Sequence, residues 1–323
     1  MKFLILVATL AITANALSNH DQWAQFKVKH SKNYNTFREE QIRFQVFSSN
    51  LLKIAEHNAR YEKGEETYFM AVNRFADLTS EEYEAMLGLQ ISSMSKPNIT
   101  SSFVADPEEP APDSIDWREK GAVTPVRNQH YPHQCGSCWA HSAAAALESH
   151  RFINENKLEV LSVQEIMDCS RDYGNAGCNG GWMDSALEYV KDHGICAESS
   201  YEYTAQNGDT CKTCEKVIHT FKEVVEVGPS EQLIKEAVGT VGPVTVAVDA
   251  SKWQLYAGGI FDGNCGYTVN HGVLVVGYGQ ENNKDFWLIK NSHGAEFGEN
   301  GYIRLARGKD LCNITFLINY PKF

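Results

Sequence analysis

The hydrophobic pattern changes from helical to strand-like along this chain of 323 residues, which limits the folds open to it. Residues 17–110 contain no cysteine and carry a helical pattern. Residues 138–153 form an apolar, alanine-rich run that predicts a further helix. After Gly242 the pattern becomes strand-like, at residues 243–248, 272–277 and 286–289. A helical region followed by a β-rich region predicts an α+β fold with a cleft between the two.

The first residues have the pattern of a secretory signal peptide. Residues 1–12 give one positive charge and then an apolar run, and Ala14-Asn15-Ala16 is a small-x-small cleavage signal. We therefore expect residues 1–16 to be removed after Ala16. The run is too short to span a bilayer as a membrane anchor, and no later segment is apolar enough to span one. The mature protein should be soluble and pass through the secretory pathway.

Charge and cysteine content narrow the class further. The formal net charge of -12 disfavours a nucleic acid or an anionic membrane surface as partner. Nine cysteines in an oxidising compartment should mostly form disulfides, and the odd count leaves one thiol, for which Cys138 is the candidate. The pair Cys211 and Cys214 has zinc-finger spacing, but no second pair stands at zinc-site spacing. We expect no metal and no cofactor.

Cys138 lies in the run Gln134-Cys135-Gly136-Ser137-Cys138-Trp139-Ala140, and His271 and Asn291 lie far downstream. A cysteine in this context with a distant histidine and asparagine is typical of a nucleophile, its base and the residue that orients the base. A buried thiol and a core histidine would explain each residue alone. Together the three residues resemble the papain-like cysteine proteases.

This resemblance implies a papain-like two-lobed fold, with Cys138 on a helical lobe and His271 on a β-barrel lobe. It also implies three disulfides, after which Cys196 and Cys214 remain and are expected to pair. The implied disulfides are Cys135–Cys178, Cys169–Cys211 and Cys265–Cys312.

Hydrolysis by a cysteine needs the thiolate. The start of a helix at Cys138 and an imidazolium at His271 should stabilise the thiolate as a resting ion pair, with Asn291 fixing the imidazole ring. The backbone N–H of Cys138 and the side chain of Gln129, which resembles the family's oxyanion glutamine, would bind the oxyanion. Gln134 is the competing candidate for that glutamine.

Two departures from the family pattern bear on activity. Three extra residues precede Cys135, and Asn128-Gln129-His130-Tyr131-Pro132 resembles the His-x-Pro loop of the cathepsin X branch, which is linked to carboxypeptidase activity. In addition, His293 and Phe297 stand where the family usually has two tryptophans. The first tryptophan shields the Asn–His bond from water, so a weaker bond in a wetter site is expected.

Substrate contacts are read from the run Gly180-Gly181-Trp182-Met183. Its glycines would let an extended substrate backbone come close, although a tight turn beside a disulfide fits them equally well. By resemblance, an apolar pocket should accept Leu, Phe or Val at the second residue before the scissile bond. The implied pocket residues are Met183, Ala247 and Leu317, and the other implied contacts are Trp182, Asn270 and His293.

Six residues of the cysteine-free segment fall on one face of a predicted helix, and Asn73-Arg74-Phe75-Ala76-Asp77 follows them. These residues resemble the inhibitory propeptide of the cathepsin L-like branch, with Ala71 replacing a glycine of its pattern. The resemblance implies an inhibitory propeptide at 17–110, the chain's own inhibitor, and a peptidase domain at 111–323. The six residues are Glu39, Arg43, Phe47, Asn50, Ile54 and Asn58.

Residues 91–112 are rich in Ser, Pro, Asp and Glu and predict a cleavable linker, cut near Ala111. Asn98 and Asn313 begin glycosylation acceptor patterns. We expect a monomeric cysteine endopeptidase of the lysosome or the extracellular space, acting on proteins and peptides. Two alternatives stay open: a carboxypeptidase directed by His130, and a peptide-binding pseudoprotease, suggested by His293 and the displaced glutamine.

Overall fold

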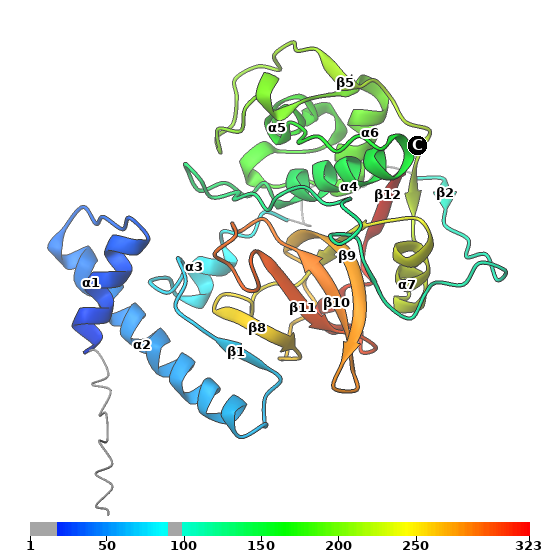
Figure 1. Cartoon of the computed structure of the whole chain (residues 1–323). Helices are drawn as coiled ribbons and strands as arrows, with labels where there is room; N and C mark the ends of the chain where they lie inside the picture. The colour runs from blue at the N-terminus through cyan, green and yellow to red at the C-terminus, as the bar shows by residue number, and fades with distance from the viewer. Residues whose placement is uncertain (1–17, 90–98) are drawn as a thin grey trace, which may run out of the picture.

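The computed structural model describes residues 18–89 and 99–323. The predicted signal peptide, Asn98 and the first part of the predicted linker lie outside these residues. A helical lobe and a sheet lobe lie one above the other, and the amino-terminal helices lie beside the sheet lobe (Figure 1). The predicted α+β class and its two-lobed arrangement are confirmed.

The helical lobe is built around α4 (Cys138–Glu155), the helix predicted from the alanine-rich run. Fourteen residues of α4, from Cys138 to Arg151, are buried, because the helix packs on other helices and also on the sheet lobe. Small alanine side chains allow this close approach on several sides. The remaining elements of the lobe are α5 (Val163–Cys169), α6 (Met183–His193), β4 (Ile195–Cys196) and β5 (Lys216–Ile218).

The sheet lobe contains the predicted strands β7 (Val244–Val248), β9 (His271–Glu281) and β10 (Lys284–Lys290). Its strand order is β1-β8-β11-β10-β9-β7-β12-β6-β2, with β3 beside β9. In the antiparallel pair of β7 and β9, Val248 lies opposite His271. The other elements are β8 (Tyr256–Phe261), β11 (Tyr302–Ala306), β12 (Ile318–Lys322), β6 (Glu223–Glu226), β2 (Ser101–Ser102), β3 (Ile115–Asp116) and α7 (Glu231–Thr240).

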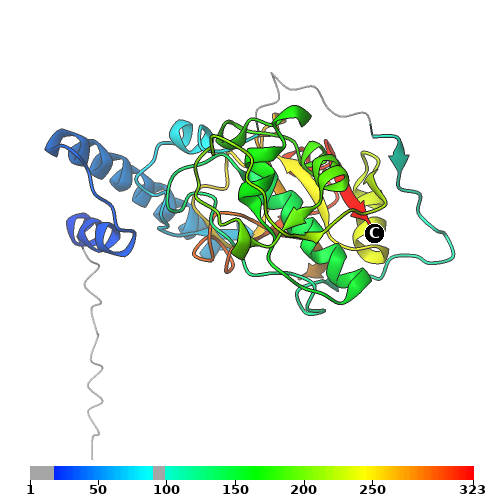
Figure 2. The same cartoon turned by 90° about the horizontal axis from the view of Figure 1, so that it is seen from above.

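The amino-terminal segment comprises α1 (Asn19–Lys29), α2 (Phe37–Glu62), β1 (Tyr68–Met70) and α3 (Ser80–Glu84). Figure 2 shows α1 and α2 projecting from one side of the molecule, away from the carboxyl terminus. The strand β1 pairs antiparallel with β8 and so adds an edge strand to the sheet. This pairing joins the segment to the sheet lobe through backbone hydrogen bonds.

All six patterned residues lie in α2, as predicted. The face they form binds the segment that follows in the chain: Asn50 donates to the Ala76 carbonyl (2.8 Å) and Asn58 to the Met70 carbonyl (2.8 Å). Phe47 is fully buried. The partner of the predicted helix face is therefore largely the rest of the propeptide.

Candidate active site

Cys138, His271 and Asn291 meet where the two lobes join. Cys138 is the first residue of α4, His271 begins β9, and Asn291 directly follows β10, the neighbour of β9 in the sheet. His271 Nε2 lies 2.7 Å from Asn291 Oδ1. Because an amide oxygen only accepts hydrogen bonds, Nε2 carries the hydrogen and donates it. This bond fixes the ring and leaves Nδ1 for other chemistry.

Burial opposes charge on both the thiol and the imidazole in this structure. Burial raises the pKa of the Cys138 thiol to about 11, although backbone hydrogen bonds from Gly272 and Gly88 act in the opposite direction. Burial also lowers the pKa of His271 to about 4, partly offset by its bond to Asn291. Burial in this form therefore opposes the resting ion pair expected from the sequence, because a buried site solvates two charges poorly.

The propeptide crosses the site beside Cys138. A Cβ added to Gly88 would stand 2.0 Å from the Gly136 carbonyl oxygen, so the two backbones are in direct contact. The next residue, Leu89, donates from its backbone N–H to the Asn270 carbonyl (3.0 Å). The chain therefore occupies the space in which a substrate backbone would have to lie.

Leu89 is only 3% exposed and belongs to the same apolar cluster as the three predicted pocket residues, Met183, Ala247 and Leu317. Ala247 donates from its backbone N–H to the Leu317 carbonyl (3.1 Å), which keeps these two residues adjacent. Leu89 and the three predicted pocket residues therefore belong to one continuous apolar core.

Of the two candidate oxyanion glutamines, Gln129 is buried and Gln134 is exposed. The Gln129 amide donates to the Cys135 carbonyl (3.0 Å), and its oxygen accepts from the Ser292 hydroxyl (2.7 Å). An amide group has two N–H hydrogens, so these bonds hold the group and leave one donor. The geometry favours Gln129 despite the displaced sequence position.

His293 lies flat on His271, with ring centroids 4.8 Å apart and planes 23° apart. His130, from the inserted loop, stacks on His293 at 5.1 Å. Phe297 contacts His293 edge-on at 5.5 Å. The replacement of the tryptophan suggested a wetter site, but His293 is only 1% exposed in this form because other rings cover it.

The cover over this stack comes from the propeptide. Phe75 packs edge-on against His293 and His130, and the Tyr83 hydroxyl lies 3.5 Å from His293 Nε2. Both ring nitrogens of His130 and Nδ1 of His293 are buried with no hydrogen-bond partner among the described residues. Burial, the largest cause, lowers the pKa of both histidines well below the ordinary value.

The glycine run forms a tight turn. Gly180 has a φ of 114°, and a Cβ on Gly181 would stand 2.6 Å from the Trp139 ring and 2.5 Å from Asn175 Oδ1. Trp182 is buried and donates from its backbone N–H to the same Asn175 oxygen (2.8 Å). Packing of this turn accounts for Gly181 without a substrate.

Four disulfides occur in the described parts of the chain, and Cys138 is the cysteine left free there. They have the pairing expected from the sequence, and they place Cys211 and Cys214 in different disulfides, which removes the zinc pair. The pairs are Cys135–Cys178, Cys169–Cys211, Cys196–Cys214 and Cys265–Cys312.

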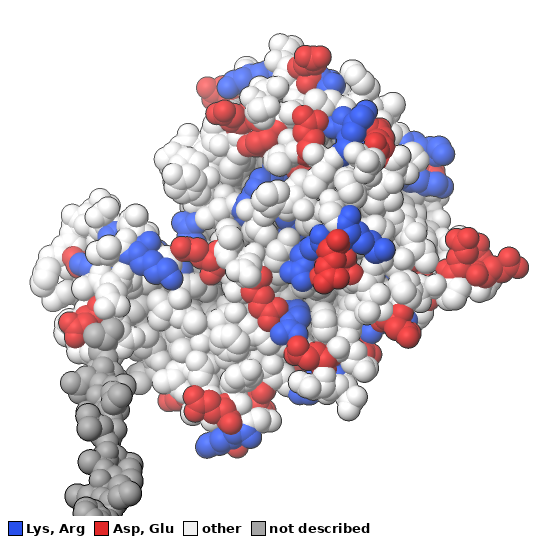
Figure 3. All heavy atoms as spheres, in the orientation of Figure 1, with Lys and Arg blue, Asp and Glu red and all other residues white. Residues whose placement is uncertain are grey.

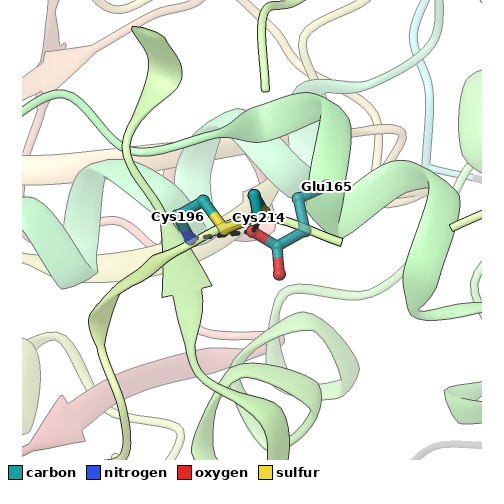
Figure 4. A group of neighbouring side chains, drawn as sticks. All are labelled: Glu165, Cys196 and Cys214. Carbon is teal, nitrogen blue, oxygen red and sulfur yellow. Dashed lines mark hydrogen bonds between the residues drawn. A yellow bond between two sulfur atoms is a disulfide. The ribbon is translucent and has the colours of Figure 1, made fainter. Parts of the chain in front are cut away.

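One group of possible metal ligands exists within the described residues: Glu165, Cys196 and Cys214 (Figure 4). The two sulfurs are bonded to each other. The Glu165 carboxylate accepts from the Cys196 backbone N–H (2.8 Å) and the Tyr189 hydroxyl (3.1 Å), and pairs with Lys216. A disulfide and a saturated carboxylate offer no site for an ion.

The visible face of the molecule carries lysines and arginines interspersed with acidic residues, without one large positive patch (Figure 3). None of the helices in residues 18–89 and 99–323 combines the length and apolar content that crossing a bilayer requires.

The sequence analysis did not single out Tyr83, Gly88 or Leu89 as site residues. A usable signal was the sequence Leu87-Gly88-Leu89 after the last propeptide helix, because a glycine between two apolar residues suits a chain that passes close to another backbone.

Comparisons with known proteins agree with this architecture. Residues 111–322 match the papain family cysteine protease, and residues 23–83 match the cathepsin propeptide inhibitor domain. The chain is 46% identical over 331 residues to a cathepsin L-like proteinase of Phaedon cochleariae, with 99% of each chain covered. It is 42% identical to digestive cysteine proteinase 3 of Homarus americanus, over 98% of this chain and 99% of that one. The solved structure of digestive procathepsin L 3 from Tenebrio molitor larval midgut superposes with a TM-score of 0.87 at 42% identity, covering 95% of this chain and 100% of that one.

Proposed function

Since this chain belongs to the papain family of cysteine proteases and is a cathepsin L-like endopeptidase zymogen, we propose that it cleaves peptide bonds through Cys138, His271 and Asn291. The observation that carries this proposal is the 2.7 Å bond from His271 Nε2 to Asn291. The residue after His271, Gly272, lies against the start of α4, where Cys138 stands. The same bond argues against the pseudoprotease alternative, because a chain that only binds peptides has no need of an oriented imidazole.

In the proposed reaction, the Cys138 thiolate attacks the scissile carbonyl carbon, and His271 Nδ1 gives its proton to the leaving amine. The oxyanion formed in this step accepts hydrogen bonds from the Cys138 backbone N–H and the Gln129 amide. Water then attacks the thioester and gives a proton to His271, the carbon–sulfur bond breaks, and the carboxylic acid product leaves with the Cys138 thiolate and the protonated His271 restored.

Activation requires removal of the propeptide. We propose that residues 1–16 are the signal peptide, 17–110 the inhibitory propeptide and 111–323 the peptidase, acting in the lysosome or outside the cell as a monomer. Once Gly88 and Leu89 leave, water reaches Cys138 and His271, and the penalty that burial places on the ion pair is reduced.

The substrate pocket supports an apolar preference at the second residue before the scissile bond. Leu89 is buried in the same apolar cluster as Met183, Ala247 and Leu317 in the zymogen. A peptide with Leu, Phe or Val at this position would replace Leu89 with a similar side chain.

A carboxypeptidase activity is the second candidate. His130 stacks on His293, which stacks on His271, so the inserted loop lies at the catalytic histidine. A protonated His130 there would attract the terminal carboxylate of a substrate. Comparing cleavage of a peptide that ends in a free carboxylate with its amidated twin, for the wild type and His130→Ala, separates this activity from endopeptidase activity.

The main test uses the full-length zymogen, activated in acid. An epoxide thiol trap should label wild-type protein at one residue, and Cys138→Ala should abolish both labelling and peptide hydrolysis, by at least about 10³-fold. As a matched control, Cys196→Ala removes a disulfide cysteine and should leave Cys138 labelling in place. Substantial hydrolysis by Cys138→Ala would exclude this mechanism.

A further inference from the structure

Three imidazole rings stack on one another at the site, so the charge of each ring affects the pKa of the next. His271, His293 and His130 follow one another with centroid distances of 4.8 Å and 5.1 Å. Two parallel imidazolium rings at such distances repel each other, so one ring opposes protonation of the next. A neutral aromatic ring in the same place has the opposite effect, because its face attracts a cation.

Only His271 has to be protonated for the reaction proposed above. A neutral His293 therefore supports the protonated His271 from one face, while Asn291 holds its edge. A protonated His293 would favour the neutral form of His271 and, with it, the unreactive thiol of Cys138.

We infer that His293 is a positioning residue whose own protonation sets the acid limit of activity. As a neutral ring it holds His271 in its charged form, and when it gains a proton from solvent the thiolate–imidazolium pair is lost. This inference rests on the proposed roles of Cys138 and His271.

Within residues 18–89 and 99–323, no acidic side chain forms an ion pair with His293. It faces His271 from β9, His130 from the inserted loop and, more distantly, His141 from α4, all of which lower the pKa of His293 after the larger effect of burial. Arg74 of the propeptide acts in the same direction and Tyr83 covers the ring, but both leave on activation. Glu296, on the same loop, is directed to His30 of the propeptide (3.4 Å).

The test compares His293→Phe with the wild type in the acid-activated enzyme. Phe keeps a ring against His271 and is neutral at every pH. The acid midpoint of kcat/KM should move down by about one pH unit, and so should the acid midpoint for alkylation of Cys138 by iodoacetamide, which involves no substrate binding. His293→Lys should reduce alkylation throughout the acid range. The exposed His219, changed to Phe, should leave the midpoint in place.

His293→Trp serves as a second variant with a neutral ring. Titration with the thiol trap measures the concentration of competent enzyme, so a variant that is partly misfolded still gives a valid acid midpoint. Acid midpoints of His293→Phe and His293→Trp that coincide with the wild type would overturn the inference. If Cys138→Ala still hydrolysed peptides, the proposed mechanism itself would fail, which is a separate result from an unchanged midpoint.

Discussion

Gly88 of the propeptide and Gly136 of the peptidase lobe are in backbone contact: a Cβ added to Gly136 would stand 2.8 Å from the Gly88 Cα, and one added to Gly88 would stand 2.0 Å from the Gly136 oxygen. Gly136 also donates to the Cys178 carbonyl (3.0 Å), next to the Cys135–Cys178 disulfide. The disulfide-linked backbone has little freedom to move away. Latency therefore depends on the absence of side chains at both positions.

Gly88→Ala should weaken latency for this reason. The added methyl group would push the propeptide away from Cys138, so the thiol in the uncleaved zymogen should react with iodoacetamide at least about tenfold faster at fixed pH. Gly64→Ala is the control for backbone strain alone, because its φ of 76° disfavours alanine while nothing lies within 4 Å of the added Cβ. Equal labelling rates for Gly88→Ala and the wild type would contradict the prediction.

Propeptide binding should weaken in acid because it buries neutral histidines. Burial lowers the pKa of His130 well below 6.5 in the zymogen, and removal of Phe75 should return it toward that value. A histidine whose pKa is lowered by binding must lose its proton when the propeptide binds. Binding therefore weakens once the pH falls below the pKa of that histidine in the free enzyme. The inhibition constant of segment 17–110 should therefore rise between pH 7 and pH 5.5, by up to about tenfold for His130.

The variant His130→Phe, made in the mature enzyme, should remove its share of that rise. His133→Phe is the control, because His133 lies in the same loop and is exposed. If His130→Phe shows the full pH dependence of the wild type, the acid effect must come from other groups. One such group is Glu82, whose pKa is lowered by its hydrogen bond to Arg43.

The sequence predicted the elements that depend on local periodicity. The six patterned residues lie in α2, the alanine-rich run is α4, and three predicted strands are β7, β9 and β10. The residues of α2 recur at helical spacing, and the three strands are short apolar runs rich in β-branched or aromatic residues, so local sequence is enough to recognise them.

The contacts that close the site could not be predicted in this way. The histidine stack joins residues 130, 271 and 293, which come together only when the loop before α4 lies beside the strand ends. Leu89 joins the core of the helical lobe and donates to the Asn270 carbonyl, 181 residues later in the chain. Long-range contacts of this kind leave no periodic signal in the sequence.

The two glutamines can be separated by mutation. Gln129→Ala should lower kcat of the mature enzyme by about 10²–10³-fold with a small change in KM, because a donor to the oxyanion acts mainly in the transition state. Gln134→Ala, at an exposed position five residues away, should have little effect. A large loss of kcat in Gln134→Ala alone would assign the oxyanion donor to the other glutamine.

Ala247 should control the size of the substrate pocket. It is fully buried and bonds to the Leu317 backbone, and in the proposed pocket its small side chain would leave room for a larger residue of the substrate. Ala247→Leu would fill part of that room, so the ratio of kcat/KM for a peptide with Phe to one with Val, two residues before the cleavage point, should fall at least about tenfold.

The matched control is Ala295→Leu, the same change at an exposed position beyond His293, which should keep the wild-type ratio. Measuring the two peptides in competition within one reaction removes differences in active enzyme concentration from the comparison. Since one extra methylene changes discrimination in an apolar pocket by about 10–200-fold, a real pocket at Ala247 gives a clear signal. An unchanged ratio in Ala247→Leu, or a wild-type preference for Arg over Leu, would show that this cluster does not receive the substrate side chain.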